Sequence, residues 1–119
     1  MLGLTIASGP VAVDVTAAAK FKKTPVKFVD MRDARTVEGE FLYTPKTAKI
    51  GAGTRVTWRN PSSQPHTVTD PAKKPAFDSG LQDLIETGEK WSFVFRKAGK
   101  YNYYCIVHPD MIGRVLVTR

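Results

Sequence analysis

The chain has 119 residues, 42% of them hydrophobic and 24% charged, and its sequence contains no apolar run near the roughly 18 residues that a membrane-spanning helix needs. This length and composition are typical of one globular domain that buries a sizeable core without disulfides or a structural metal. Eighteen Lys and Arg against eleven Asp and Glu give a net charge of +7. That charge favours anionic surfaces as partners.

A basic balance by itself is also compatible with nucleic acid binding. The basic residues are scattered along the sequence, however, with no zinc-finger spacing, no strand that combines aromatic and basic residues on one platform, and no helix rich in Lys and Arg. We therefore expect no nucleic acid partner.

The first residues, Met1–Ala7, lack the basic residues that open a secretory signal, and Asp14 interrupts the apolar stretch. The single cysteine excludes an intramolecular disulfide, so cysteine pairing does not indicate the compartment. We expect a periplasmic or other extracytoplasmic protein from which a signal or anchor segment has been removed.

Two short strands are predicted in the first third of the chain, at residues Val11–Val15 and Val26–Val29. A Lys-rich stretch that ends at Pro25 separates them. We treat residues 1–38 as an N-terminal extension or a set of extra strands, and residues 39–119 as the core of a single domain that spans residues 1–119.

Residues 54–59 alternate between apolar and polar side chains and predict a half-buried strand with Val56 and Trp58 on one face. The next six residues, Asn60–Pro65, are rich in turn formers, so His66 begins its segment directly after a loop. Residues 69–90 are predicted to be a long connection, with a single helical turn near residues 81–85.

The last third of the chain predicts three more strands. Residues 91–95 alternate, and residues 101–105 place Tyr101, Tyr103 and Cys105 on one face and Tyr104 on the other. The last strand is predicted at Gly113–Val117. Many short strands at intervals of roughly 8 to 12 residues, with Gly and Pro between them, favour an all-β sandwich of about seven to nine strands.

A short run before this last strand contains three residue types that bind copper. Cys105, His108 and Met111 are each separated by two residues, and His66 is the only other histidine. A thiolate, two imidazoles and a weak thioether are the ligand set of a trigonal copper site with a long axial Met, which passes single electrons. The four residues together predict such a site.

Each of these residues has a simpler explanation when it is taken alone, because a single Cys is often an inert buried thiol. Their joint order and spacing favour a metal site instead. Structural zinc is the weaker alternative, since it takes four strong ligands and a thioether is not one of them. A Cys–His nucleophilic pair needs a third group to orient the imidazole, and the sequence marks none. A catalytic copper centre needs additional histidines, so we expect no enzyme.

The stretch from about Gly39 to the C-terminus resembles the cupredoxins, the blue copper proteins, and is most similar to their amicyanin, plastocyanin and auracyanin-like members. The residues that carry the resemblance are Thr54–Asn60, Pro65–Val68, Phe77–Gly80 and Gly99–Met111. The short spacing between Cys105, His108 and Met111 looks like that of amicyanin rather than plastocyanin, whose last gap is longer.

The resemblance implies a Greek-key β-sandwich that holds one type 1 copper ion. It implies that His66, Cys105, His108 and Met111 are the ligands, and that the backbone N–H of Thr67 donates to the Cys105 sulfur. Family members often have Asn in place of Thr67 and Pro in place of Val107. These two departures bear on the reduction potential, which hydrogen bonds and packing around the sulfur control.

The function implied by the resemblance is electron transfer: a small type 1 copper protein that shuttles single electrons between redox partners by cycling between Cu(II) and Cu(I). The alternative is a periplasmic copper carrier or storage protein with the same ligands. We expect a monomer that binds its redox partners transiently through an apolar face around His108, formed by Pro65, Pro109 and Ile112. Tyr104 is either a second electron port or plain strand packing.

Overall fold

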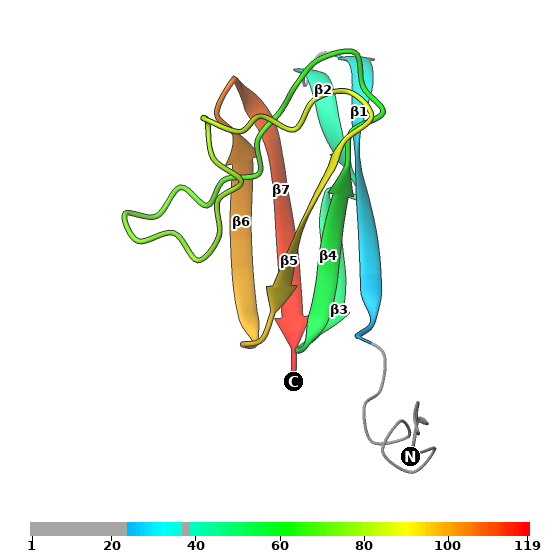
Figure 1. Cartoon of the computed structure of the whole chain (residues 1–119). Coiled ribbons are helices and arrows are strands. Elements are labelled where there is room, and N and C mark those ends of the chain that lie inside the picture. Colours follow the sequence, from blue (N-terminus) through cyan, green and yellow to red (C-terminus); the bar gives the residue numbers. More distant parts are fainter. Residues whose placement is uncertain (1–23, 37–38) are drawn as a thin grey trace, which may run out of the picture.

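The structure is a computed structural model that describes residues 24–36 and 39–119. These residues form two β-sheets that pack face to face (Figure 1). The strand predicted at residues 11–15 lies outside the described residues. In the part of the chain that the structure describes, no helix is long and apolar enough to cross a membrane.

The first sheet has four strands in the order β2-β1-β4-β5, in which β1 pairs antiparallel with β2 and parallel with β4. The second sheet has three strands in the order β3-β7-β6, in which β7 runs parallel to β3 and antiparallel to β6. The bounds of the seven strands are β1 Val26–Thr36, β2 Gly39–Thr44, β3 Thr47–Gly51, β4 Thr54–Arg59, β5 Lys90–Phe95, β6 Gly99–Cys105 and β7 His108–Thr118.

The all-β Greek-key sandwich predicted from the sequence is confirmed, with seven strands among the described residues. The strand predicted at residues 26–29 is also confirmed and continues to Thr36 as β1. It lies between β2 and β4, and the side chains of Val29 and Met31 are fully buried. Residues 1–38, which we predicted to lie outside the core, thus contribute the strand β1 to the core. The assignment of residues 1–119 to one domain stays a prediction.

Aromatic side chains from both sheets and from the long connection fill the space between the sheets. Trp58 of β4 is fully buried, and its ring centroid lies 5.6 Å from that of Trp91 and 6.3 Å from that of Phe95, both on β5. Across the sandwich it meets Tyr103 of β6 edge to face at 5.4 Å, and it stacks with Phe77 of the connection at 6.1 Å. Such pairs stabilise a core beyond the area that they bury.

The long connection between β4 and β5 is confirmed, but the helical turn predicted near residues 81–85 is wrong. Residues 81–83 form a turn and a bend. Ile85 is instead paired with His66, with the Ile85 N–H donating to the His66 carbonyl at 2.9 Å and the His66 N–H donating to the Ile85 carbonyl at 3.1 Å. A helix in a segment this short would form too few hydrogen bonds to offset the free-energy cost of its nucleation. The bridge to His66 instead buries Ile85 in the core, at 4% exposure.

The last strand begins five residues before the predicted Gly113, because β7 starts at His108. Only Ile106 and Val107 form the turn between β6 and β7. The register shifts within this hairpin, so that Tyr104 pairs with Ile112 and Cys105 pairs with His108. The extra residues of β7 between these pairs include Met111, which is buried.

We predict that Gly113→Ala destabilises the fold. Gly113 pairs with Tyr103 across the hairpin, and a Cβ at this glycine would overlap the ring and hydroxyl of Tyr103. Forcing an extra methyl group into a packed core costs about 1–3 kcal/mol. Urea unfolding should show this loss, whereas Gly51→Ala, whose Cβ meets no atom within 4 Å, should change stability little. Equal unfolding midpoints for the two variants would contradict this account of the hairpin.

Candidate metal centre

Three potential metal-ligand atoms from distant parts of the chain converge at one end of the sandwich. Nδ1 of His66 lies 3.1 Å from Nδ1 of His108, and Sγ of Cys105 lies 3.8 Å and 3.6 Å from these two nitrogens. Bonds of about 2.0–2.3 Å from one ion to imidazole nitrogen and thiolate sulfur place such donors roughly 3–4 Å apart. The three side chains therefore fit a shared metal ion without rearrangement.

The backbone places each of these residues at the end of a paired segment. His66 follows the turn-rich loop after β4 and is held by its bridge to Ile85. Cys105 is the last residue of β6, and His108 is the first residue of β7. Met111 follows in β7 at 1% exposure and shares the lining of a small hollow with His108. The structure thus brings together three of the four predicted ligands and places Met111 beside His108.

The donors differ in their access to solvent. His66 and Cys105 are completely buried, whereas His108 is half-buried. Phe41 of β2 packs against both imidazoles, with ring centroids 4.9 Å from His66 and 4.4 Å from His108. Sequence reasoning missed this contact, because nothing in the sequence relates β2 to the two histidines. The part of the site that reaches the surface is therefore His108.

The Thr67 N–H donates to Sγ of Cys105 at 3.3 Å, as the resemblance implied. A hydrogen bond to this sulfur stabilises the thiolate and adjusts the properties of a bound metal. The Thr67 side chain adds a second link, because the N–H of Ile106 donates to Thr67 Oγ1 at 2.9 Å. The Thr69 hydroxyl lies 2.9 Å from Thr67 Oγ1 and 2.9 Å from Oδ1 of Asp78. A threonine thus connects the two ligand segments where many family members have asparagine.

Ser62 and Asn60 hold the far side of the His66 ring. The second ring nitrogen, Nε2, lies 2.7 Å from the Ser62 hydroxyl, which lies 2.6 Å from Oδ1 of Asn60. The Asn60 amide nitrogen donates to the carbonyls of Gln64 and Ile85, both at 2.8 Å. With Nε2 engaged in this way, Nδ1 is the nitrogen that faces the other donors, and outer hydrogen bonds of this kind fix a ligand ring in place.

Sequence reasoning treated Asn60 and Ser62 only as turn formers. Their spacing of two residues is typical of a turn in which an Asn side chain accepts a hydrogen bond from the backbone two residues later. The structure has this bond, from the Ser62 N–H to Asn60 Oδ1 at 2.9 Å. The sequence signal for the turn was present, but the contact with His66 depends on the folded loop.

Burial shifts the pKa values of both histidines. The pKa of His66 falls from 6.5 to about 4, first because the ring is buried and then because His108 is close, while Asp33 opposes the shift. Burial also lowers the pKa of His108, and the carboxylate of Glu40 acts in the opposite direction. At neutral pH both rings are therefore neutral, which is the form that binds a metal ion.

Residues 31–118 match a known family, the copper binding proteins of the plastocyanin/azurin family. The chain belongs to this family. Over 95 residues it is 30% identical to an amicyanin from Paracoccus versutus, which covers 78% of this chain and 72% of the amicyanin. It is 36% identical over 87 residues to a chloroplastic plastocyanin from Tetradesmus obliquus, covering 66% of this chain and 60% of the plastocyanin.

Solved cupredoxin structures have the same architecture. A purple cupredoxin from Nitrosopumilus maritimus superposes with a TM-score of 0.66 and 32% identity, over 76% of this chain and 98% of that one. The reduced form of a tryptophan-to-tyrosine variant of amicyanin gives a TM-score of 0.64 and 27% identity, over 84% of this chain and 88% of that one. The cupredoxin fold and the resemblance to amicyanin and plastocyanin are thereby confirmed.

The cofactor of this cupredoxin is copper at a type 1 site. The buried thiolate and the two imidazoles are donors that suit copper, and zinc is disfavoured because the fourth candidate, Met111, is a thioether. The amicyanin and plastocyanin relatives are electron carriers and not enzymes, which confirms the expectation that this chain is not an enzyme.

We predict that the copper-free protein loses stability in acid. Unfolded His66 binds a proton near pH 6.5 and folded His66 only near pH 4, so between these values the unfolded state holds more protons and acid favours unfolding. The contribution is fully present above pH 6.5 and is lost as the pH falls through 4, by about 3 kcal/mol. Urea unfolding at several pH values should show this slope, and His66→Gln should flatten it. An unchanged slope in the variant would contradict the assignment.

The Thr67 hydroxyl gives a second prediction for this site. Thr67→Val keeps the shape of the side chain but removes the acceptor of the Ile106 N–H. A lost partner for a partly buried amide costs about 1 kcal/mol or more, so hydrogen exchange at the Ile106 amide should accelerate by about tenfold. Thr67→Ser keeps the hydroxyl and should leave that amide protected. Rapid exchange in both variants would show that the hydroxyl is not the link.

Proposed function

We propose that this cupredoxin is an electron carrier whose copper ligands are His66, Cys105, His108 and Met111. The observation that carries the proposal is the convergence of two Nδ1 atoms and one thiolate sulfur within 3.1–3.8 Å of one another. Met111, buried next to His108, supplies the weak fourth ligand. Copper, when bound, supplies a one-electron couple between Cu(II) and Cu(I).

The contribution of the chain is to hold the donors in fixed positions. His66 is fixed by backbone hydrogen bonds to Ile85 and by the Ser62 hydroxyl on its Nε2. Cys105 is fixed by the strand pairing of β6 and by the Thr67 N–H on its sulfur. Ligands held in this way rearrange little when the charge of the site changes, which keeps the barrier to electron transfer low. The short turn between Cys105 and His108 limits the freedom of the third ligand.

Electrons leave and enter through His108, because the other three ligands are buried. Val107 and Pro109 line a hollow together with His108 and are both exposed, Val107 at 40%. Ile112 is 48% exposed and Pro65 is half-buried. We propose that these residues form the apolar face on which redox partners dock. Redox complexes of this kind bury little surface and exchange quickly. The role of Tyr104 as a second port and the monomeric state stay predictions.

A copper carrier or storage protein would use the same ligands. The complete burial of Cys105 and His66 disfavours it, because a carrier must release its ion to an acceptor that reaches these donors. We also expect a periplasmic or other extracytoplasmic location, in which a copper-bound thiolate is compatible with oxidising conditions.

The visible spectrum tests the proposal. Adding Cu(II) should produce an intense thiolate-to-copper band that ascorbate bleaches and an oxidant restores. Cys105→Ala should abolish the band entirely, whereas Val107→Ala, in the same turn, should keep it. Fast loss of copper to a chelator would favour a carrier, and copper binding without the band would show that Cys105 is not a ligand.

A further inference from the structure

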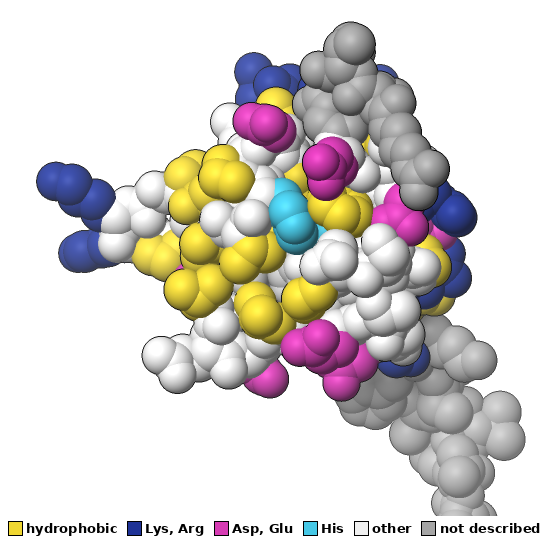
Figure 2. Space-filling model, turned by 90° about the horizontal axis from the view of Figure 1, so that it is seen from above, with side chains coloured by type: hydrophobic (Ala, Val, Ile, Leu, Met, Phe, Trp, Pro, Cys, Tyr) yellow, Lys and Arg dark blue, Asp and Glu magenta, His cyan; other side chains and the backbone are white. Residues whose placement is uncertain are grey.

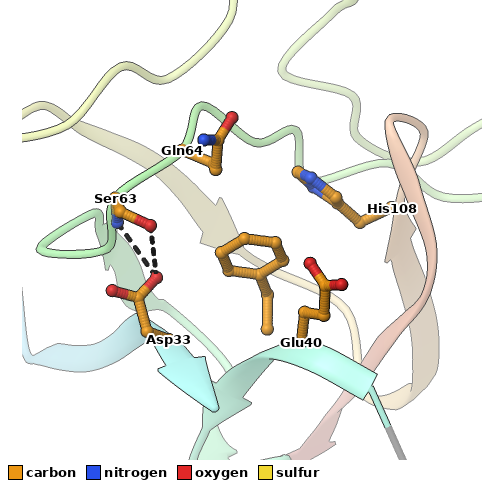
Figure 3. Close-up of a pocket in the computed structure, with 6 residues that line it drawn as sticks. Asp33, Glu40, Ser63, Gln64 and His108 are labelled. Carbon is orange, nitrogen blue, oxygen red and sulfur yellow. Dashed lines mark hydrogen bonds between the residues drawn. The ribbon is translucent and has the colours of Figure 1, made fainter. Parts of the chain in front are cut away.

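Carboxylates surround the exposed edge of His108. One hollow beside it, of about 630 Å³, is lined by Asp33, Glu40, Phe41, Ser63 and Gln64 together with His108 (Figure 3). A second hollow of about 310 Å³ is also lined by Glu40 and His108, and it contains Asp110. Among the residues whose side chains the structure describes, no Lys or Arg lines either hollow. The mouth of the metal site is thus acidic, although the whole chain has a net charge of +7.

The end face of the molecule shows the same distribution. Figure 2 shows a histidine side chain at the centre of this face. Hydrophobic side chains lie on one side of it and acidic side chains lie around it, while Lys and Arg are seen at the margins. The charge that would meet a docked partner therefore differs in sign from the charge of the chain as a whole.

A neighbouring groove has the opposite character. It has a volume of about 520 Å³, lies along Tyr104, Pro109 and Ile112, and is flanked by Lys46 and Arg114. Among the described residues, no Asp or Glu lines this groove. Two apolar surfaces that share Pro109 thus carry charges of opposite sign.

Glu40 and Asp110 carry the argument for the acidic face. Both side chains are exposed. Figure 3 shows the carboxylate of Glu40 on the same side of the hollow as the His108 ring, and its effect on the pKa of that ring agrees with this proximity. Asp33 is already engaged by the backbone N–H and the hydroxyl of Ser63, at 3.0 Å and 2.8 Å. We therefore assign it no part in docking.

We propose that the His108 face docks a redox protein whose contact surface carries Lys or Arg side chains around an apolar centre. The proposal rests on the proposed function, since it names the partner that would exchange electrons with the copper site through His108. Val107 and Pro109 supply the apolar contact, and Glu40 and Asp110 supply the charges that a cationic rim would meet. Complementary charges of this kind determine which partners approach and how they are oriented.

Screening decides which charge a partner encounters. At an ionic strength of about 0.1 M, charges further away than roughly 10 Å are largely screened. The net charge of the chain then acts only weakly on an approaching partner, whereas the carboxylates at the docking face act at contact distance. A cationic rim is therefore preferred at this face despite the basic composition.

Two redox-inert paramagnetic ions of opposite charge test this assignment on the full-length, ¹⁵N-labelled protein at about 0.1 M ionic strength. Hexaamminechromium(III) should broaden the amide signals around Glu40, His108 and Asp110. Hexacyanochromate(III) should instead broaden those around Lys46 and Arg114. Collection of the anionic probe at the His108 face, or no preference of the cationic probe for it, would overturn the proposal.

Variants identify the groups responsible. Glu40→Gln combined with Asp110→Asn should reduce the broadening by hexaamminechromium(III) at the His108 face by about threefold or more. Glu89→Gln removes a carboxylate from a different surface hollow and should leave that broadening unchanged. An equal reduction by Glu89→Gln would overturn the proposal, because it would show that only the net charge matters.

The copper-free protein carries the same acidic face, so the probes are applied to both copper-free and copper(I)-loaded samples. Absence of the thiolate-to-copper band would overturn the proposed function but would not change the distribution of the probes. A normal band with the wrong probe distribution would overturn the docking assignment alone. The two proposals therefore fail in different experiments.

Discussion

The metal centre depends on the contact between two segments that are far apart in the sequence, and a backbone pairing is part of that contact. Thr69 and Tyr104 exchange both of their backbone hydrogen bonds, each at 3.0 Å. This pairing holds the segment that contains His66 against the end of β6, one residue before Cys105. The Thr67 N–H on the Cys105 sulfur and the Thr67 hydroxyl at the Ile106 N–H continue the same contact. Together these contacts hold the two parts of the ligand set in a fixed relation.

The site and the core are therefore formed by the same packing event. His66 belongs to the connection between the two strands of the first sheet that hold Trp58 and Trp91, whereas Cys105 and His108 belong to the hairpin of the second sheet. The donors meet only when the sheets close on their aromatic core. A ligand that binds only the folded form adds its binding free energy to stability, so copper should strengthen the whole sandwich rather than the loop end alone.

The sequence predicted the features that depend on residues close together in the chain. Cys105, His108 and Met111 share one short run, and the alternation in β4 is visible in six residues. Alternation does not tell which strands pair, so the parallel pairing of β1 with β4 and the register shift in the last hairpin were not predictable. The contact of Ser62 with His66 was missed for the same reason. A helical turn was predicted near Ile85 from local sequence alone. It is absent because Ile85 pairs instead with His66, which is distant in the sequence.

The distribution of charge on the surface also could not be predicted from the sequence, and it affects which partners bind. A net charge can be counted from the sequence, but it is the fold that places Glu40 of β2 and Asp110 of β7 in one hollow with His108. The fold likewise places Lys46 and Arg114 in the neighbouring groove. Because screening removes the distant charges first, the proposed choice of partner depends on this local arrangement and not on the total. The strands that fix the copper ligands thus also fix the charges that a partner meets, which joins the chemistry of the site to its selectivity.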